Sequence, residues 1–454
     1  MRWFSSEERP TPVVLLRIAI ALQAAAGLAC GLPGHLSVDS VMQLYEARTL
    51  HFISFQPPMM SLLLRVFDTW VRGTALFVVV DQALLTASFA LLLAQRKEPL
   101  SWVAAVIAAL VVLNPLLIVY TGLVWKDVLM SHLAAFGYVC LYVAARQTDR
   151  RRIKWTLGAV VVLALATSLR QHAIVLAIPG AVYAAFLLSR KCMTRWWLAV
   201  ALSVAIIGVN TAILAYADAV AVGEKIPRTE TGLRSLANFD LAGIAANGGV
   251  IPDPAIAAQI ETYRPYYTPL RHDQPDAPEG SPLWRTRTAQ LLMLLGRSIV
   301  RSPGAYLSHR AASFGALLWQ SGTNQLCGPV RVGVVSTVYV PSLGRDIVPE
   351  LGLDTTLSLR DQRLWRFTAR LLHTPFFNHV FWSIVLGAAA LTLWMRGGAG
   401  PLVVLAGAVI VFALVFAIVG ISCDFRYLYI LPVAATLLLF VLLIVPLDKQ
   451  DAHR

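Results

Sequence analysis

The sequence predicts an all-α polytopic membrane protein with about ten transmembrane helices. Of its 454 residues, 57% are hydrophobic and only 14% are charged, which is far more apolar than a soluble protein of this length. Apolar stretches of roughly 17–22 residues, long enough to cross a bilayer as helices, recur from one end of the chain to the other. The expected spans lie near residues 13–32, 74–94, 102–120, 127–145, 155–169, 173–189, 197–217, 376–395, 401–421 and 427–446.

The first apolar run lacks a clear small-residue cleavage site, so it is expected to remain as a helix. Lys and Arg follow alternate spans, and loops rich in these residues stay in the cytoplasm. The clusters are Arg96-Lys97, Arg146 to Lys154, Arg190 to Arg195, Arg396, and Lys449 with Arg454. This pattern predicts that both termini are cytoplasmic and that the long loop 218–375 lies outside. The net charge of +13 is explained by topology and by contact with anionic lipid, so nucleic acid is not an expected partner.

Three parts of unequal size follow from this pattern. Residues 1–217 form an N-terminal transmembrane bundle, 218–375 an exocytoplasmic loop region, and 376–454 a C-terminal group of transmembrane helices. The middle part is too polar and too rich in Pro for membrane helices. Within it, Leu291–Val300 and Tyr306–Trp319 have helical periodicity with interspersed Arg, and are expected to lie in the membrane interface as amphipathic helices.

The cysteines permit one disulfide and do not indicate a metal site. Cys327 and Cys423 fall on the expected outer side, where a disulfide is permitted, and the sequence leaves open whether they pair. No C-x-x-C motif or His cluster indicates a metal centre. No cofactor is predicted, although a divalent cation remains open.

The segment after the first span carries an unusual acidic pattern. Asp39 and Glu46 stand seven residues apart and share a face of any helix formed there, and Pro57-Pro58 interrupts the chain before the next apolar run. An acidic helix at the outer membrane surface would let a carboxylate meet a substrate delivered by the lipid.

Four polar clusters fall on the expected outer side, near the ends of spans. A single charged group at such a place commonly snorkels to the interface without further function. Together, however, several cations and carboxylates outline a site that could hold a phosphate and a catalytic base. The clusters are His35 with Asp39 and Glu46, Trp125-Lys126-Asp127, Arg170-Gln171-His172, and Asp424-Phe425-Arg426-Tyr427.

Five motifs, PGHLSVDSVMQLYEA, QPPMMSLLLRVF, GLVWKDVL, SLRQHA and DFRYLYILP, resemble the bacterial branch of the GT-C superfamily. These are integral-membrane glycosyltransferases that take sugars from polyprenyl-phosphate carriers, distantly related to the aminoarabinose transferase of lipid A and to protein O-mannosyltransferases. The resemblance covers the first 172 residues well and the last two spans moderately. The loop 218–375 matches only in general character.

The resemblance implies a GT-C-like bundle with a membrane-parallel helix in the first outer loop. That helix would carry the catalytic carboxylate at Asp39, and a second acidic position matches Asp127. Glu46 is a weaker candidate for the base. Relatives often place His directly before the Pro-Pro pair, whereas this chain has Gln56 there.

The chemistry of such a transfer assigns roles to the remaining polar residues. The leaving phosphate needs cations, and guanidinium and ammonium groups supply them. The candidates for binding the donor phosphate are Lys126, Arg170 and Arg426. Further candidates for binding substrate are His35, Gln56, His172 and Tyr427.

The expected function is therefore transfer of a sugar from a polyprenyl-phosphate carrier to an envelope glycan, lipid or protein acceptor. It would take place at the outer face of a bacterial inner (plasma) membrane. The alternatives are a transporter or flippase of a lipid-linked sugar, and a non-catalytic component of an envelope polysaccharide assembly complex. Ionisable residues inside the spans are few, chiefly Asp81 and Arg17, whereas the outer clusters are dense, and this contrast favours an enzyme.

Overall fold

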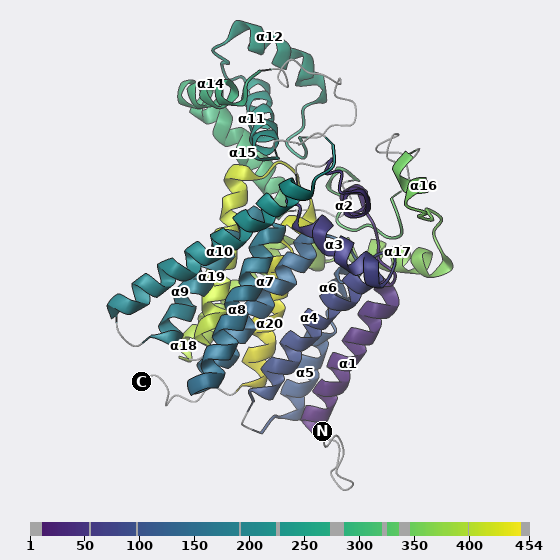
Figure 1. The fold of residues 1–454 in the computed structure, drawn as a ribbon, viewed down its shortest axis with the longest axis vertical. Coiled ribbons are helices and arrows are strands. Elements are labelled where there is room, and N and C mark those ends of the chain that lie inside the picture. The colour runs from purple at the N-terminus through teal and green to yellow at the C-terminus, as the bar shows by residue number, and fades with distance from the viewer. Residues whose placement is uncertain are drawn as a thin grey trace.

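The computed structural model describes residues 11–53, 56–96, 99–189, 192–223, 228–272, 286–319, 325–335, 346–397 and 399–445. This part of the chain is helical, with only isolated β-bridges between its segments. Figure 1 shows long helices packed side by side as a bundle, with a smaller group of helices standing above one end. That end is called the upper end below.

Nine helical segments among the described residues are long and apolar enough to cross a membrane, so the chain is a polytopic α-helical membrane protein. They are α1 (Pro12–Gly31), α4 (Ala75–Ala94), α5 with α6 (Trp102–Val112 and Pro115–Tyr120), α7 (Lys126–Ala145), α8 (Asp149–Leu169), η1 with α9 (Gln171–Ala173 and Ile174–Leu188), α10 (Cys192–Val220), α19 (Gly400–Val419), and η6 with α20 (Phe425–Leu428 and Ile430–Ile444).

The remaining predicted span, near 376–395, corresponds to α18 (His379–Met395), an apolar helix of 17 residues that is shorter than these nine segments. It packs beside α19 and α20. The lower end of α1 and the C-terminal end of α20 lie at the same end of the bundle (Figure 1), so the described helices cross it an even number of times.

Helix α7 forms the centre of the bundle. It is apolar on all sides and almost entirely buried, and it contacts α4, α8, α9, α19 and α20. By contrast, α10 lies aslant at the periphery and exposes most of its apolar side chains (Figure 1). The first residues of α7, Lys126 and Asp127, are thus fixed at the upper end of the most rigidly packed helix.

Two short helices, α2 (Val38–Thr49) and α3 (Met59–Trp70), lie across the upper ends of the spans (Figure 1). Hydrogen bonds fasten the start of α2 to the segment before α7. The Ser40 hydroxyl donates to the carbonyl oxygen of Val124 at 2.6 Å, and the Trp125 indole N–H donates to Ser37 Oγ at 2.8 Å. Asp39 is thereby held close to Lys126.

The loop region 218–375 contains its own helical group, which rises above the bundle (Figure 1). It consists of α11 (Arg228–Ala246), α12 (Pro254–Tyr263), η2 (Arg264–Tyr266), α14 (Thr288–Arg301) and α15 (Pro303–Leu318). The predicted segments Leu291–Val300 and Tyr306–Trp319 fall in α14 and α15. The apolar side of α14 packs against α11 in a separate small core, so it is covered by protein.

The rest of this region returns to the bundle through η3 (Gln325–Cys327), α16 (Val348–Glu350), α17 (Leu359–Leu371) and η5 (Pro375–Phe377). A disulfide joins Cys327 to Cys423, so the pairing that the sequence left open is present. Arg310 of α15 donates to the carbonyl oxygen of Gly420 at 2.6 Å. Both links attach the loop region 218–375 next to the turn between α19 and η6.

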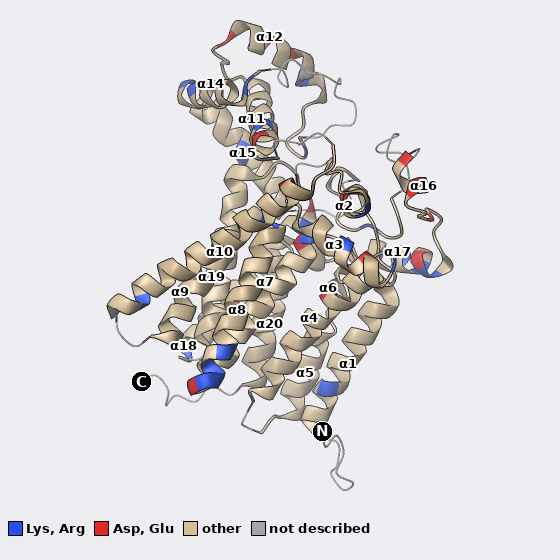
Figure 2. Ribbon diagram, viewed as in Figure 1, with Lys and Arg blue, Asp and Glu red and all other residues tan. Residues whose placement is uncertain are grey.

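Cations mark the opposite end of the bundle. Figure 2 shows Lys and Arg at the lower end of α8, where Arg150-Arg151-Arg152 and Lys154 lie. At the upper end of the bundle, carboxylates and cations occur together (Figure 2).

Two glycines allow α1 to approach the segment between α6 and α7. A Cβ on Gly122 would lie 2.5 Å from the Cα of Gly31, and a Cβ on Gly31 would lie 2.7 Å from the Cα of Gly122. Because the obstructing atoms are backbone atoms, we expect Gly122→Ala to destabilise the protein by about 1–3 kcal/mol. Thermal unfolding of the purified protein in detergent, followed by size exclusion, measures this effect.

Gly158→Ala is the matched control, because no heavy atom lies within 4 Å of its added Cβ and the residue is inside α8. This change should leave the protein at least as stable, since Ala favours a helix over Gly. Equal unfolding temperatures for the two variants would contradict the close approach of Gly31 and Gly122.

Candidate functional site

A cavity of about 450 Å³ opens at the upper end of the bundle, between the ends of the spans and the segments above them. Its floor is formed by residues of α7, α19 and η6 and by Arg170 directly after α8, and α2 and α11 contribute to its sides. Seven of the predicted site residues line it: Asp39, Gln56, Lys126, Arg170, His172, Arg426 and Tyr427.

Arg426 stands at the centre of the charges in this cavity. Its Nη1 lies 2.6 Å from Oδ2 of Asp39, and its Nη2 donates to Oδ2 of Asp424 at 3.1 Å. Its Nε lies 3.8 Å from Oδ2 of Asp127. The η6 turn between α19 and α20 places this guanidinium among carboxylates from three different parts of the chain.

Arg170 is held by an ion pair and by aromatic rings. Its guanidinium pairs with the carboxylate of Asp127 and lies 4.4 Å from the ring centre of Tyr427 and 5.1 Å from that of Phe416. The side chain of Asp127 is completely buried in the first turn of α7, where the positive end of the helix dipole also favours its charge. Asp127 therefore lies behind the cavity wall as the counter-ion of Arg170, and not on the cavity surface.

Gln56 connects Lys126 to Asp39. Its side-chain oxygen accepts hydrogen bonds from Lys126 Nζ and from Gln43 Nε2, the latter at 2.7 Å. Its side-chain nitrogen donates to Oδ1 of Asp39 at 2.9 Å. The residue directly before the Pro-Pro pair thus reaches the proposed base, although it is Gln and not His.

Asp39 is an ionised carboxylate that remains accessible from the cavity. Its side chain is 24% exposed. Burial by itself would raise its pKa, but the charges of Arg426 and Lys126 and the hydrogen bonds from Arg426 and Gln56 outweigh burial. Together they hold the pKa of this carboxyl well below its usual range.

Two predicted site residues lie away from the cavity. Glu46 is buried between α2 and α3, where its Oε2 accepts a hydrogen bond from the Ser61 hydroxyl at 2.6 Å. His35 is also buried: its Nε2 lies 3.0 Å from the carbonyl oxygen of Cys30, and its Nδ1 accepts from the Gly333 N–H at 3.0 Å. In this structure Glu46 joins two helices, and His35 fastens the segment around Gly333 to the end of α1.

Sequence reasoning missed the contribution of the outer region to the cavity wall. Arg271 lines the cavity, with its Nη1 3.5 Å from Oδ1 of Asp424 and donating to the Leu326 carbonyl oxygen at 2.9 Å. A short backbone pairing places it there: the Cys423 N–H donates to the Leu270 carbonyl oxygen at 2.9 Å. The only sequence signal for this wall was the position of Cys423 directly before Asp424, because a disulfide from Cys423 to Cys327 would bring the outer region to this site.

One edge of the cavity is apolar. Gly232, Leu233 and Leu236 of α11 line it from above, opposite the charged floor. A ligand in this cavity would therefore meet cations on one side and a smooth aliphatic surface on the other.

A second cavity of about 230 Å³ adjoins the first, since Pro57 and Gln171 line both. It lies at the upper ends of α8, α9 and α10 beside α3. Its walls combine hydroxyl and amide groups with aliphatic side chains, namely Thr167, Ser168, Asn210, Thr211, Ile174, Ile207, Ile213 and Leu214. Such a lining suits an amphipathic ligand that extends from the charged site towards the membrane.

Four cations and three carboxylates thus meet at the upper end of the bundle: Lys126, Arg170, Arg271 and Arg426 with Asp39, Asp127 and Asp424. Within the described ranges, no group of three or more His, Cys, Asp or Glu side chains is placed to hold a metal ion. The arrangement can bind a phosphate and present a carboxylate beside it. No protein-family model, curated protein or solved structure matches this chain.

Proposed function

We propose that the protein is an integral-membrane glycosyltransferase that moves a sugar from a polyprenyl-phosphate carrier to an envelope glycan, lipid or protein acceptor. The observation that carries this proposal is the common cavity of Asp39, Lys126, Arg170 and Arg426 at the ends of the spans. A carboxylate and three cations meet there at the depth where the headgroup of a membrane lipid would lie. The motifs that resemble the GT-C superfamily contain all four of these residues.

In the proposed reaction, the carboxylate and the cations of the cavity have different roles. The acceptor hydroxyl attacks the anomeric carbon of the sugar, and the bond between that carbon and the phosphate oxygen breaks. Asp39 accepts the hydroxyl proton, and the carrier leaves as a phosphate monoester. Arg426 and Lys126 stabilise the charge that grows on the leaving phosphate.

Donor binding would also activate the base. Without donor, the ion pair with Arg426 lowers the pKa of Asp39 and makes it a weak proton acceptor. A phosphate that binds Arg426 competes with Asp39 for the same guanidinium, which weakens the ion pair and raises the basicity of the carboxylate. In this proposal, Asp127 keeps Arg170 in place while the exchange occurs.

Two features support an orientation with the cavity on the outer side of a bacterial inner (plasma) membrane. The Cys327–Cys423 disulfide lies at the cavity end, and such bonds persist in oxidising compartments. The Lys and Arg clusters of α8 lie at the other end, as expected for the cytoplasmic side. Both termini would then be cytoplasmic.

One observation favours the alternative, a transporter of a lipid-linked sugar. Asp81 and His132 form a pair inside the bundle, with Oδ1 of Asp81 2.8 Å from Nδ1 of His132, and Nε2 of His132 lies 3.3 Å from the Tyr429 hydroxyl. Buried ionisable groups at such a depth often belong to transport pathways. This pair is satisfied within the bundle, whereas the accessible charges gather at the upper end.

Reconstituted proteoliposomes distinguish the two functions. The purified protein would receive a panel of radiolabelled polyprenyl-phosphate sugars together with an envelope extract as acceptor. We expect one donor to lose its sugar to the acceptor. Movement of an intact donor across the bilayer, without loss of sugar, would instead identify a transporter, and no consumption of any donor would contradict the proposed enzyme.

The phosphate-binding role predicts that Lys is a poor substitute at two positions. A guanidinium holds a phosphate through two parallel hydrogen bonds, which an ammonium cannot do. We expect Arg170→Lys and Arg426→Lys each to lower turnover at least about tenfold and to raise the KM for donor. Steady-state kinetics in proteoliposomes with varied donor concentration measures both effects.

Arg396→Lys is the matched control, because Arg396 follows α18 at the other end of the bundle. It should behave as wild type. If both cavity variants keep full turnover and donor affinity, the phosphate must be bound elsewhere.

A further inference from the structure

Helix α17 is anchored beside the upper end of α1. Asp361, Leu364 and Thr368 form its buried side, and the Ser358 hydroxyl accepts a hydrogen bond from the Asp361 N–H at 3.1 Å at its start. Arg360 pairs with Asp361 at 3.0 Å and donates to the carbonyl oxygen of Leu32, the residue directly after α1. The helix therefore lies at the level where the first membrane span reaches the surface.

Three arginines form a stripe on the opposite side of α17. Arg363, Arg366 and Arg370 follow each other at intervals of three and four residues, so they share one helical face, and all three are exposed. In the described parts of the chain none of the three guanidinium groups has an ion-pair partner; Arg366 Nε only reaches the Gln362 carbonyl oxygen of its own helix, at 3.4 Å. Each retains donors for an anion from outside the protein.

Large apolar side chains accompany this stripe. Leu359 and Phe367 of α17 lie on or next to the face of the three arginines and are 72% and 47% exposed. Exposed Leu and Phe side chains beside Arg on a surface helix are typical of helices that lie in the membrane interface. In water alone, this combination would leave apolar surface uncovered.

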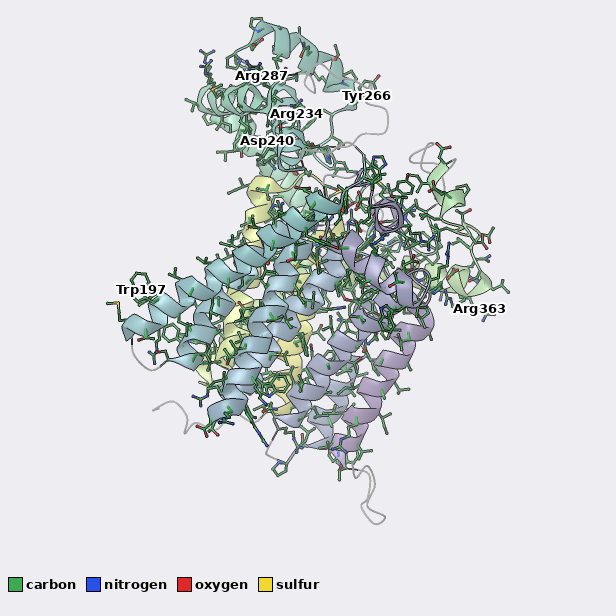
Figure 3. The ribbon with its side chains drawn as sticks, in the orientation of Figure 1. Trp197, Arg234, Asp240, Tyr266, Arg287 and Arg363 are labelled. Carbon is green, nitrogen blue, oxygen red and sulfur yellow. A yellow bond between two sulfur atoms is a disulfide. The ribbon has the colours of Figure 1, made fainter. Side chains whose placement is uncertain are left out.

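The stripe of three arginines on α17 faces away from the bundle. In Figure 1, α17 lies to the right of the spans, level with the upper end of α1, and Figure 3 shows Arg363 pointing outward from it. The lipid molecules around the bundle would present their headgroups at this level.

We propose that α17 binds the anionic headgroups of phospholipids in the leaflet at the cavity end of the bundle. The phosphate oxygens would accept hydrogen bonds from Arg363, Arg366 and Arg370, while Leu359 and Phe367 enter the interface beside them. This surface is separate from the charged cavity and does not depend on the proposed transferase activity. It would gather anionic lipid at one side of the protein.

A local fluorescence measurement tests this proposal on the full chain. Gln362, which is exposed on α17, is changed to Cys and labelled with bimane, in a background where Cys30, Cys140 and Cys192 are Ala. The protein is placed in phosphatidylcholine nanodiscs that contain a small fraction of doxyl-labelled phosphatidylglycerol or doxyl-labelled phosphatidylcholine. The ratio of quenching by the two labelled lipids reports enrichment of the anionic lipid near α17.

We expect labelled phosphatidylglycerol to quench more strongly at low salt, because each Arg near an anionic surface increases local enrichment roughly fivefold. Changing Arg363, Arg366 and Arg370 together to Gln should bring the quenching ratio close to one, whereas changing all three to Lys should keep most of the enrichment. Changing Arg150, Arg151 and Arg152 to Gln, at the other end of the bundle, is the matched control and should leave the ratio unchanged.

Three results would overturn the proposal. The first is equal quenching by the two lipids in the protein that keeps all its arginines. The second is an enrichment that survives when Arg363, Arg366 and Arg370 are changed to Gln. The third is an enrichment that falls equally in the control variant.

Discussion

Replacing Asp39 by Asn should lower turnover by about 10²–10⁴-fold while the protein still accumulates and binds donor. The Asn side chain keeps the shape of Asp and can still accept the hydrogen bond from Gln56, but it cannot take a proton at neutral pH. Arg426 retains Asp424 and Asp127 as counter-ions, so the cavity should stay assembled. Turnover in proteoliposomes and binding of a labelled donor, measured on the same preparation, separate the loss of chemistry from the loss of binding.

Glu46→Gln is the control for this experiment. Glu46 lies between α2 and α3, and Gln can still accept the hydrogen bond from the Ser61 hydroxyl, so near-normal turnover is expected. A loss of less than about tenfold in Asp39→Asn, with Glu46→Gln folded but inactive, would transfer the role of base to Glu46. If both variants stay active, Asp127 is the remaining predicted carboxylate to test.

The second large effect concerns stability. Changing Asp127 to Asn removes the buried counter-ion of Arg170 and leaves a guanidinium with little access to water. Breaking a buried pair on one side typically costs about 3–5 kcal/mol. We therefore expect a large drop in the thermal unfolding temperature of the purified protein, together with loss of donor binding.

Two further variants identify the cause of that drop. Adding Arg170→Gln to Asp127→Asn removes the unpaired charge and should recover part of the lost stability. Glu261→Gln breaks the solvent-exposed pair with Arg264 and should change the unfolding temperature little. An Asp127→Asn protein as stable as Glu261→Gln would show that Arg170 does not need its partner.

The spans were predictable because their signal is local. A long apolar stretch must form a helix in a membrane, whatever its neighbours are. The segment 102–120 is one span, as predicted, but local pattern did not predict the break in its helix at Asn114-Pro115, between α5 and α6. Pro115 cannot donate a backbone hydrogen bond, and the Asn114 side chain accepts from the Leu116 N–H at 3.0 Å to begin the second helix.

The cavity cations were also predictable, since Lys126, Arg170 and Arg426 each stand where a span begins or ends. The end of a span fixes the depth of such a residue in the membrane. Glu46 shows what periodicity cannot provide. It shares a helical face with Asp39, but α3 packs beside its half of α2 and covers it.

Arg271 could not be predicted from local pattern at all. It lies in an irregular segment, and its place depends on backbone pairing with residues near 422, far along the chain. Long-range pairing of this kind leaves no periodic trace in a single sequence.

The Cys327–Cys423 bond has a consequence for the order in which this protein matures. It joins segments 96 residues apart, and Cys423 directly precedes Asp424, whose carboxylate contacts both Arg271 and Arg426. The last helices must be synthesised and both thiols must meet an oxidant before this covalent tie exists. The outer region is therefore tied covalently to the turn that carries Asp424 and Arg426 only after the last helices have been inserted. Until then, a freshly inserted and still reduced chain keeps Arg271 beside Asp424 by noncovalent contacts alone.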